Sequence, residues 1–208
     1  GNGTLAWAQT LGGTSNDFGF GIAVLPDGSF AITGKTASFG AGTYDILIAK
    51  YYDNGTLAWA QTLGGANDDY GFGLAASLDG SIAIVGPTSS FGAGSNDILI
   101  AKYHGNGTLA WAQTLGVAGD DSAQGIVVLP DGSIAIGGWT SSFGAGNYDA
   151  LIAKLNPQGQ LPYSNSLIQT ITAQPQIRNP TTSIITGSIS QAYQSMTQQS
   201  WTSASQST

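Results

Sequence analysis

Three aspartates spaced 52 residues apart carry carboxylates that could bind a metal ion. Asp17, Asp69 and Asp121 each lie in a glycine-containing segment, beside an asparagine or a second aspartate. Calcium takes about six to eight oxygen ligands, so these residues are calcium candidates. However, their spacing is not D-x-D-x-D-G, and the first copy has only one carboxylate here. An Asx turn that begins a strand explains the same residues. We therefore expect no resident metal and no cofactor.

A second repeated set, Asp45 with Lys50 and its equivalents, could suggest acid–base chemistry. Its odd spacing along a strand puts the two side chains on opposite faces, so they should not pair directly. We interpret Asp45 as a hydrogen-bonding residue at the start of a strand and Lys50 as a solubilising edge residue. The one histidine, His104, has no serine or aspartate motif converging on it. The sequence therefore predicts no catalytic residue, and a protein that is not an enzyme.

Tryptophans repeat at the same interval and could form a set that stacks on sugars. Trp7, Trp59 and Trp111 are 52 residues apart. A tryptophan that occurs once per repeat more often packs between sheets, so we favour a core role. Another position varies between the copies: it is Lys35 in the first repeat, Pro87 in the second and Trp139 in the third. Such variation argues against shared packing and makes Trp139 a contact candidate.

Each repeat also carries the glycosylation sequon Asn-Gly-Thr, at Asn2, Asn54 and Asn106. The Asn-Gly pair is at the same time a strong signal for a turn between two strands. The two interpretations are compatible, because a turn is where a glycan can extend into solvent. The three asparagines are thus candidates for glycosylation.

These residues belong to a 52-residue period that predicts the fold. The stretch NGTLAWAQTLGG occurs at 2–13 and 54–65, and again from 106 with Val117 in place of the last glycine. Each unit contains a hairpin (21–34 in the first copy), a strand (44–52) and a strand with alternating side chains (5–11). Four strands per ~50 residues are typical of a propeller blade. We predict an all-β fold: a β-propeller-like array of four-stranded antiparallel blades, with three full repeats and a degenerate terminal part.

The repeats resemble a known family. The order W-x-x-x-x-G-G, Asp, D-G-S-x-A-I-x-G-x-T-S-S-F-G-x-G and D-x-L-I-A-K is similar to the bacterial and archaeal β-propeller repeats called SBBP. Ala37 and Val117 depart from this pattern, and the resemblance covers about residues 2–167. It implies blades in exported or cell-surface proteins, and it brings no catalytic residues.

The strand count leaves one strand unmatched. We expect a repeat domain over 1–167, with repeats at about 2–53, 54–105 and 106–157 and an extra strand at 160–167. The N-terminal strand, with Leu5, Trp7 and Leu11, is then spare. It could complete a fourth blade that the tail begins, exchange with a neighbouring copy, or belong to a longer propeller.

Residues 168–208 form a tail rich in serine, threonine and glutamine. We expect an arm that is either a partial fourth blade or a donor strand. Strand-forming side chains mark its candidate contact segment. They are Ile184, Ile185, Ile189 and Tyr193.

Composition limits the partners. The net charge is −7, all twelve acidic residues are aspartates, and charged residues make up 8%, against roughly 25% in an average soluble protein. The basic residues are few and spread along the chain, which argues against binding to nucleic acid. No apolar run reaches the ~18 residues of a membrane span. We predict an extracellular or cell-surface structural protein that forms a fibre or layer with copies of itself by strand or arm exchange. The alternative is a secreted adhesin or glycan-binding module.

Overall fold

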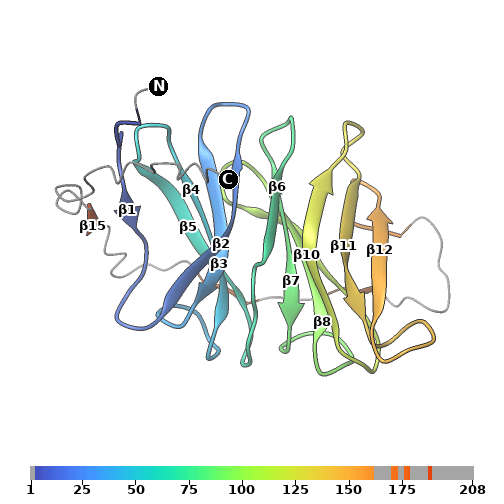
Figure 1. The fold of residues 1–208 in the computed structure, drawn as a ribbon. Helices are drawn as coiled ribbons and strands as arrows, with labels where there is room; N and C mark the ends of the chain where they lie inside the picture. The colour runs from blue at the N-terminus through green and yellow to red at the C-terminus, as the bar shows by residue number, and fades with distance from the viewer. Residues whose placement is uncertain (1–2, 162–169, 173–175, 179–186, 189–208) are drawn as a thin grey trace, which may run out of the picture.

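The repeats form three antiparallel sheets that stand side by side like blades (Figure 1). This computed structural model describes residues 3–161, 170–172, 176–178 and 187–188. Blade 1 contains β2 (Asp17–Val24), β3 (Phe30–Thr36), β4 (Asp45–Tyr51) and β5 (Leu57–Gly64). Blade 2 contains β6 (Gly73–Ala76), β7 (Ile82–Thr88), β8 (Asp97–Tyr103) and β9 (Leu109–Leu115). Blade 3 contains β10 (Asp121–Val128), β11 (Ile134–Thr140) and β12 (Asp149–Leu155). The predicted all-β array of propeller-like blades is confirmed.

Glycines place the turns of each blade. Between β2 and β3, the Leu25 carbonyl accepts a hydrogen bond from the Gly28 amide at 2.9 Å, and Gly28 has a φ of +81°. Between β4 and β5, Gly55 has the same role, with a φ of +82° and a hydrogen bond to the Tyr52 carbonyl. Each loop is therefore one residue longer than a two-residue Asp-Gly or Asn-Gly turn, and its glycine takes the left-handed position.

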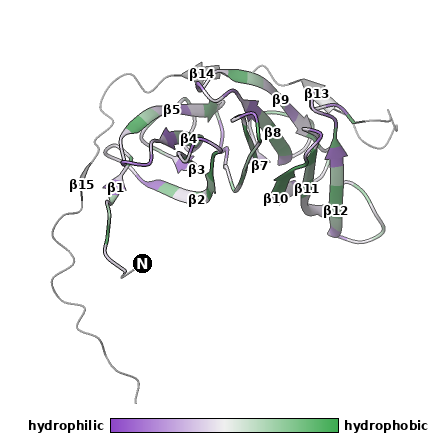
Figure 2. Cartoon of the chain, turned by 90° about the horizontal axis from the view of Figure 1, so that it is seen from above, coloured by the Kyte–Doolittle hydropathy of each residue, from purple (hydrophilic) through white to green (hydrophobic). Residues whose placement is uncertain are grey.

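The hydrophobic core lies between the blades. One cluster joins blades 1 and 2 and includes Ile46, Ile48, Ile82 and Ile84. A second cluster joins blades 2 and 3 and includes Ile98, Ile100, Ile134 and Ile136. Seen from above, the sheets fan out in chain order, from blade 1 on the left to β12 on the right (Figure 2). Blade 2 therefore buries both of its faces, and blades 1 and 3 each bury one face against it, as expected for repeats that cannot fold alone.

The chain ends add short strands outside the blades. β1 (Gln9–Thr10) pairs with β15 (Gly187–Ser188). β14 (Gln176–Arg178) pairs with β5, and β13 (Thr170–Thr172) pairs with β9, so each of these two sheets gains a fifth strand. The predicted strand at 160–167 lies almost wholly outside the described residues, as do Ile184, Ile185, Ile189 and Tyr193. Among the described residues the three blades form an open array, and none of these residues forms a helix that could cross a membrane.

Candidate functional site: the two uncovered blade faces

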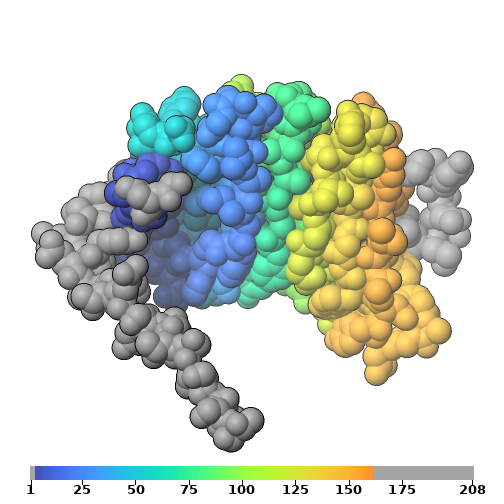
Figure 3. Space-filling model, turned by 45° about the horizontal axis from the view of Figure 1, so that its top comes forward, coloured from blue at the N-terminus to red at the C-terminus, as the bar shows by residue number. Residues whose placement is uncertain are grey.

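Neighbouring blades meet through the same pair of faces each time. The face of blade 1 with Ile48 packs on the face of blade 2 with Ile84, and blade 2 repeats this contact on blade 3. An array of three blades therefore leaves one face of each kind without a neighbour among the described residues. The space-filling view shows the blades as successive bands in chain order, from blue at one end to orange at the other (Figure 3).

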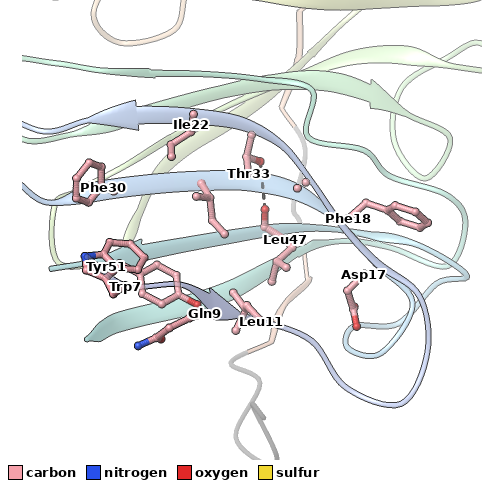
Figure 4. A pocket seen from close by; sticks show the side chains of 13 residues that line it. Trp7, Gln9, Leu11, Asp17, Phe18, Ile22, Phe30, Thr33, Leu47 and Tyr51 are labelled. Atoms are coloured by element: carbon pink, nitrogen blue, oxygen red, sulfur yellow. Dashed lines mark hydrogen bonds between the residues drawn. The ribbon is translucent and has the colours of Figure 1, made fainter. Parts of the chain in front are cut away.

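We call the free face of blade 1 the N-terminal face. Ile22 is 69% exposed and Val24 is 62% exposed. Ile84 and Ile136, the equivalents of Ile32 on this face, are buried in the two cores, whereas Ile32 is half-buried. A hollow of about 240 Å³ opens here between β2–β4 and the N-terminal segment (Figure 4). Its lining includes Trp7, Leu11, Ile22, Phe30, Ile32 and Leu47.

We call the free face of blade 3 the C-terminal face. Ile152 is 85% exposed, although its equivalents Ile48 and Ile100 are both fully buried. Val127 on β10, at the other edge of this sheet, is 57% exposed. Because these isoleucines share one strand position, the missing neighbour accounts for the difference in burial. Two residues here are smaller than in blade 2, with Gly137 at the position of Val85 and Ala150 at that of Ile98.

Each repeated tryptophan makes the same indole hydrogen bond to the next blade. The Trp59 indole N–H donates to the Gly105 carbonyl at 3.1 Å, and the Trp111 indole donates to the Pro157 carbonyl at 3.3 Å. Trp7 makes the same bond to the Asp53 carbonyl at 2.8 Å. The N-terminal segment therefore sits on blade 1 where the outer strand of a preceding blade would sit. Trp59 and Trp111 pack against the two cores, in agreement with the interpretation as packing residues.

The aspartates considered for calcium hold each hairpin together. Asp17 accepts hydrogen bonds from the Thr36 hydroxyl, from Ser38 Oγ at 2.8 Å and from the Gly13 amide at 2.9 Å. Thr88 and Ser90 bind Asp69 in the same way, and Thr140 and Ser142 bind Asp121. Among the residues that the structure describes, no three His, Cys, Asp or Glu side chains are grouped to hold a metal ion. This geometry gives the three carboxylates a structural role.

The interpretation of Lys50 as an exposed edge residue is wrong. β4 is an inner strand of its sheet, and Lys50 is buried, with its Nζ 2.9 Å from Asp27 Oδ2. Hydrogen bonds from Ser29 and Lys50 hold the pKa of Asp27 well below its usual range. Asp45 does bind the start of its strand, because it accepts bonds from the Ala41 and Gly42 amides. Lys154 on the C-terminal face is more exposed than Lys50 and lies 3.8 Å from Asp131.

The variable position of the repeats faces the next blade. Lys35 Nζ lies 4.0 Å from the ring centroid of Tyr44 and 4.5 Å from that of Tyr70, which belongs to blade 2. Trp139 occupies the equivalent position on the C-terminal face, where it is half-buried and packs edge-to-face on the exposed Tyr148 at 4.9 Å. By repeat symmetry, Trp139 lies on the side of its blade that in blade 1 contacts the next blade.

The sequon asparagines Asn54 and Asn106 lie in exposed turns, whereas Asn2 is outside the described residues. In both turns the asparagine Oδ1 accepts a hydrogen bond from the amide two residues on. Ile22, Val24 and Ile152 are not among the residues predicted from the sequence. Comparing each repeat position with its two equivalents could have pointed to them, because the first and last copies must each present an end face.

Fold and repeats together define a β-propeller-type repeat protein. Residues 78–109 and 129–161 match the family model described as "Domain of unknown function (DUF5122) beta-propeller", in agreement with a bacterial β-propeller repeat family. A curated protein of Caulobacter vibrioides, "Regulatory protein FlaEY", is 27% identical over 137 residues. That alignment covers 58% of this chain and 14% of the Caulobacter protein, so the chain spans a small part of this relative.

Proposed function

We propose that the chain is a structural subunit that assembles head-to-tail with copies of itself. The C-terminal face of one copy would dock on the N-terminal face of the next. The observation that carries this proposal is Ile152, which is 85% exposed while Ile48 and Ile100 are fully buried at the same repeat position. The chain already forms this junction twice within itself, so a second copy brings a face of the matching kind.

Strand donation would accompany docking. In the internal junctions, Lys50 lies opposite Trp59 and Lys102 lies opposite Trp111 in the β4–β5 and β8–β9 pairs. β12 is the last described strand of its sheet, and the N-terminal segment already lies in the position of an outer strand. On docking, residues 5–11 of one copy would run along β12 of the other and place Trp7 opposite Lys154.

The smaller side chains of the C-terminal face bear on the strength of this contact. Ala150 and Gly137 bury less apolar area than Ile98 and Val85 would, and buried area contributes roughly 25 cal/mol per Å². We therefore expect the contact between copies to be weaker than an internal junction, with assembly that depends on concentration.

We further propose an extracellular location, with assembly into a fibre or surface layer. Exposed turns carry the sequons at Asn54 and Asn106, and the surface has few charges. A heterologous contact gives a ring if its rotation closes and a filament if it does not. Two copies would supply six blades, within the usual 4–8 of a closed propeller.

Sedimentation velocity over a range of concentrations, followed by negative-stain electron microscopy, tests the proposal. We expect concentration-dependent assembly of the full chain and its loss in Ile152→Arg, with Leu78→Arg as a control. Leu78 is also a large exposed apolar residue, but it lies in the β6–β7 turn, away from both end faces. Wild-type chain that stays monomeric at every concentration would overturn the proposal.

A glycan-binding module is the second candidate, and an aromatic surface supports it. Phe18 and Phe20 are 43% and 47% exposed and continue into Tyr44, Tyr70 and Phe72 through ring contacts of 5.4–6.4 Å. Flat aromatic rings with exposed faces are suited to stacking on ligands. Binding of the monomeric Ile152→Arg variant to a glycan array, lost in Phe18→Ala with Phe20→Ala, would favour this candidate.

A further inference from the structure

Two buried carboxylates face each other at the junction of blades 2 and 3. Asp97 begins β8, Asp121 begins β10, and both are almost fully buried. A Cβ added to Gly116 would overlap with both Asp97 Oδ1 and Asp121 Oδ2. The glycine therefore leaves the space through which the two carboxylates approach. Asp45, Asp69 and Gly64 repeat this arrangement at the junction of blades 1 and 2.

One oxygen of the pair has no hydrogen-bond partner. Asp121 Oδ1 and Oδ2 accept bonds from Thr140 and Ser142, and Asp97 Oδ2 accepts a bond from the Gly94 amide at 2.9 Å. Asp97 Oδ1 is buried and accepts none. Leaving a buried carboxylate oxygen unpaired next to a second carboxylate is costly, because both burial and the like charge disfavour the ionised form.

The other charged groups near the pair do not neutralise it. Asp120 adds a third carboxylate at this junction and accepts a hydrogen bond from Asn96 Nδ2 at 3.0 Å. The ion pairs of the described residues involve Lys50 with Asp27 and Lys154 with Asp131, away from this pair. Burial is the main cause that raises the pKa of Asp97; the Gly94 amide lowers it, and the charge of Asp121 raises it further.

Each end face carries one half of the same arrangement. At the N-terminal face, the three atoms nearest to a Cβ on Gly12 all belong to Asp17, whereas Gly64 and Gly116 each have two aspartates among theirs. At the C-terminal face, Asp149 occupies the position of Asp97 and accepts a bond from the Gly146 amide at 3.1 Å. A backbone hydrogen bond also repeats at both internal junctions. The Asp121 amide donates to the Asn96 carbonyl, and the Asp69 amide donates to the Tyr44 carbonyl.

We propose that Asp97 and Asp121 share one proton, and that docking of a second copy builds the same proton-sharing pair from Asp149 and the partner subunit's Asp17. The second half of this inference rests on the proposed self-assembly. The proton would sit on Asp149 and be donated to the carboxylate of the partner subunit's Asp17. Tyr148 and Asn16 replace Asn96 and Asp120 here, so the third carboxylate is missing from this junction. Because the docked pair binds a proton as it forms, assembly would take up one proton, and the contact between copies would strengthen as the pH falls.

A proton fits the site better than a metal ion. Calcium requires about six to eight oxygen ligands, and no three His, Cys, Asp or Glu side chains of the described residues are grouped so that they could hold a metal ion. A proton on Asp97 Oδ1 satisfies the bare oxygen and removes the repulsion between the two carboxylates at once. Stabilisation of the full chain by added calcium, lost in Asp97→Asn, would overturn the proton and favour a cation.

Unfolding of the monomeric Ile152→Arg chain at different pH values tests the internal pair. Because the pKa of Asp97 is raised on folding, the folded chain binds this proton more tightly than the unfolded chain. Stability from this group should therefore rise as the pH falls from neutral towards about 4. Adding Asp97→Asn should remove that rise, since an amide needs no proton. An identical pH profile in both chains would overturn the internal pair, and a ¹³C carboxyl titration of Asp97 provides a second readout.

Sedimentation velocity between about pH 7.5 and about pH 4.5 tests the docked pair, because uptake of one proton changes the dissociation constant up to about tenfold per pH unit. Asp149→Asn should assemble more tightly than wild type at neutral pH and lose this part of the pH dependence. Asp79→Asn removes the same charge from the exposed β6–β7 turn of the middle blade and should keep it.

The outcomes separate the two proposals. Wild type that assembles with the same pH profile as Asp149→Asn would overturn the docked pair and leave self-assembly standing. Wild type that stays monomeric at every pH would overturn self-assembly, and the docked pair with it, while the internal pair is still judged by the unfolding profiles.

Discussion

The junction between blades 2 and 3 and the free face of blade 3 have nearly the same sequence and opposite environments. Ile100 in the junction is fully buried, whereas Ile152 on the free face is 85% exposed. At the junction of blades 1 and 2, Lys50 is buried beside Asp27, whereas Lys154 on the free face is more exposed beside Asp131. Equivalent isoleucines therefore differ in burial because one has a neighbouring blade and the other has none among the described residues. A repeat sequence specifies the surface of each blade, and the array decides which surfaces are buried.

The largest expected effect comes from the isoleucines themselves. Ile100→Ala should destabilise the chain by about 2–5 kcal/mol, because it leaves a cavity in a packed core. Ile152→Ala should change the stability of the monomer by no more than about 0.5 kcal/mol, as at other exposed sites. Urea unfolding at a concentration below the onset of assembly measures both. Equal losses in the two variants would show that the C-terminal face is already covered within one chain.

The turn glycines give the next largest contrast. Gly107 has a φ of +86°, and a Cβ there would lie 2.8 Å from the Trp59 ring. Gly107→Ala should cost about 1–2 kcal/mol for the left-handed backbone, and more for displacing the ring. Gly3 is its equivalent in the first copy, where a Cβ meets nothing within 4 Å. Gly3→Ala should therefore destabilise the chain less than Gly107→Ala in thermal unfolding. A similar loss in both variants would mean that the contact between Gly107 and the Trp59 ring contributes nothing to stability.

The threonine hydroxyls that donate to the aspartates give a third contrast between a junction and an end face. Thr140→Val removes the hydrogen bond to Asp121, which is fully buried, and should cost about 1–3 kcal/mol. Thr36→Val removes the same bond to Asp17, which is half-buried at the end face, so water can replace part of it. We expect a smaller loss of unfolding free energy for Thr36→Val. If both losses are equal, Asp17 is as well shielded in solution as Asp121.

Much of the fold followed from the 52-residue period. The period aligned Trp7, Trp59 and Trp111, and their shared bond to the next blade confirms that alignment. The β4–β5 turn was expected at Asn54-Gly55 and lies there, but the loop is one residue longer. Loop length depends on backbone hydrogen bonds that residue preferences do not specify.

The candidate site was harder to predict, because it depends on contacts between repeats. The burial of Lys50 follows from the position of β4 inside its sheet and from a neighbouring blade that covers its face. Asp97 and Asp121 are 24 residues apart and belong to different repeats, so their approach follows from the stacking of blades. The pattern within one repeat shows neither. Leu5, Trp7 and Leu11 were expected to contact a partner; Trp7 and Leu11 line the hollow on the N-terminal face.

A mixing experiment tests most directly whether the two end faces bind each other. Ile22→Arg should block the N-terminal face and Ile152→Arg the C-terminal face, so each variant alone should stay monomeric. Mixed in equal amounts, the two variants keep one intact face each, and sedimentation velocity should show a one-to-one dimer that does not grow further. A mixture that stays monomeric while wild type assembles would contradict head-to-tail docking of the two faces.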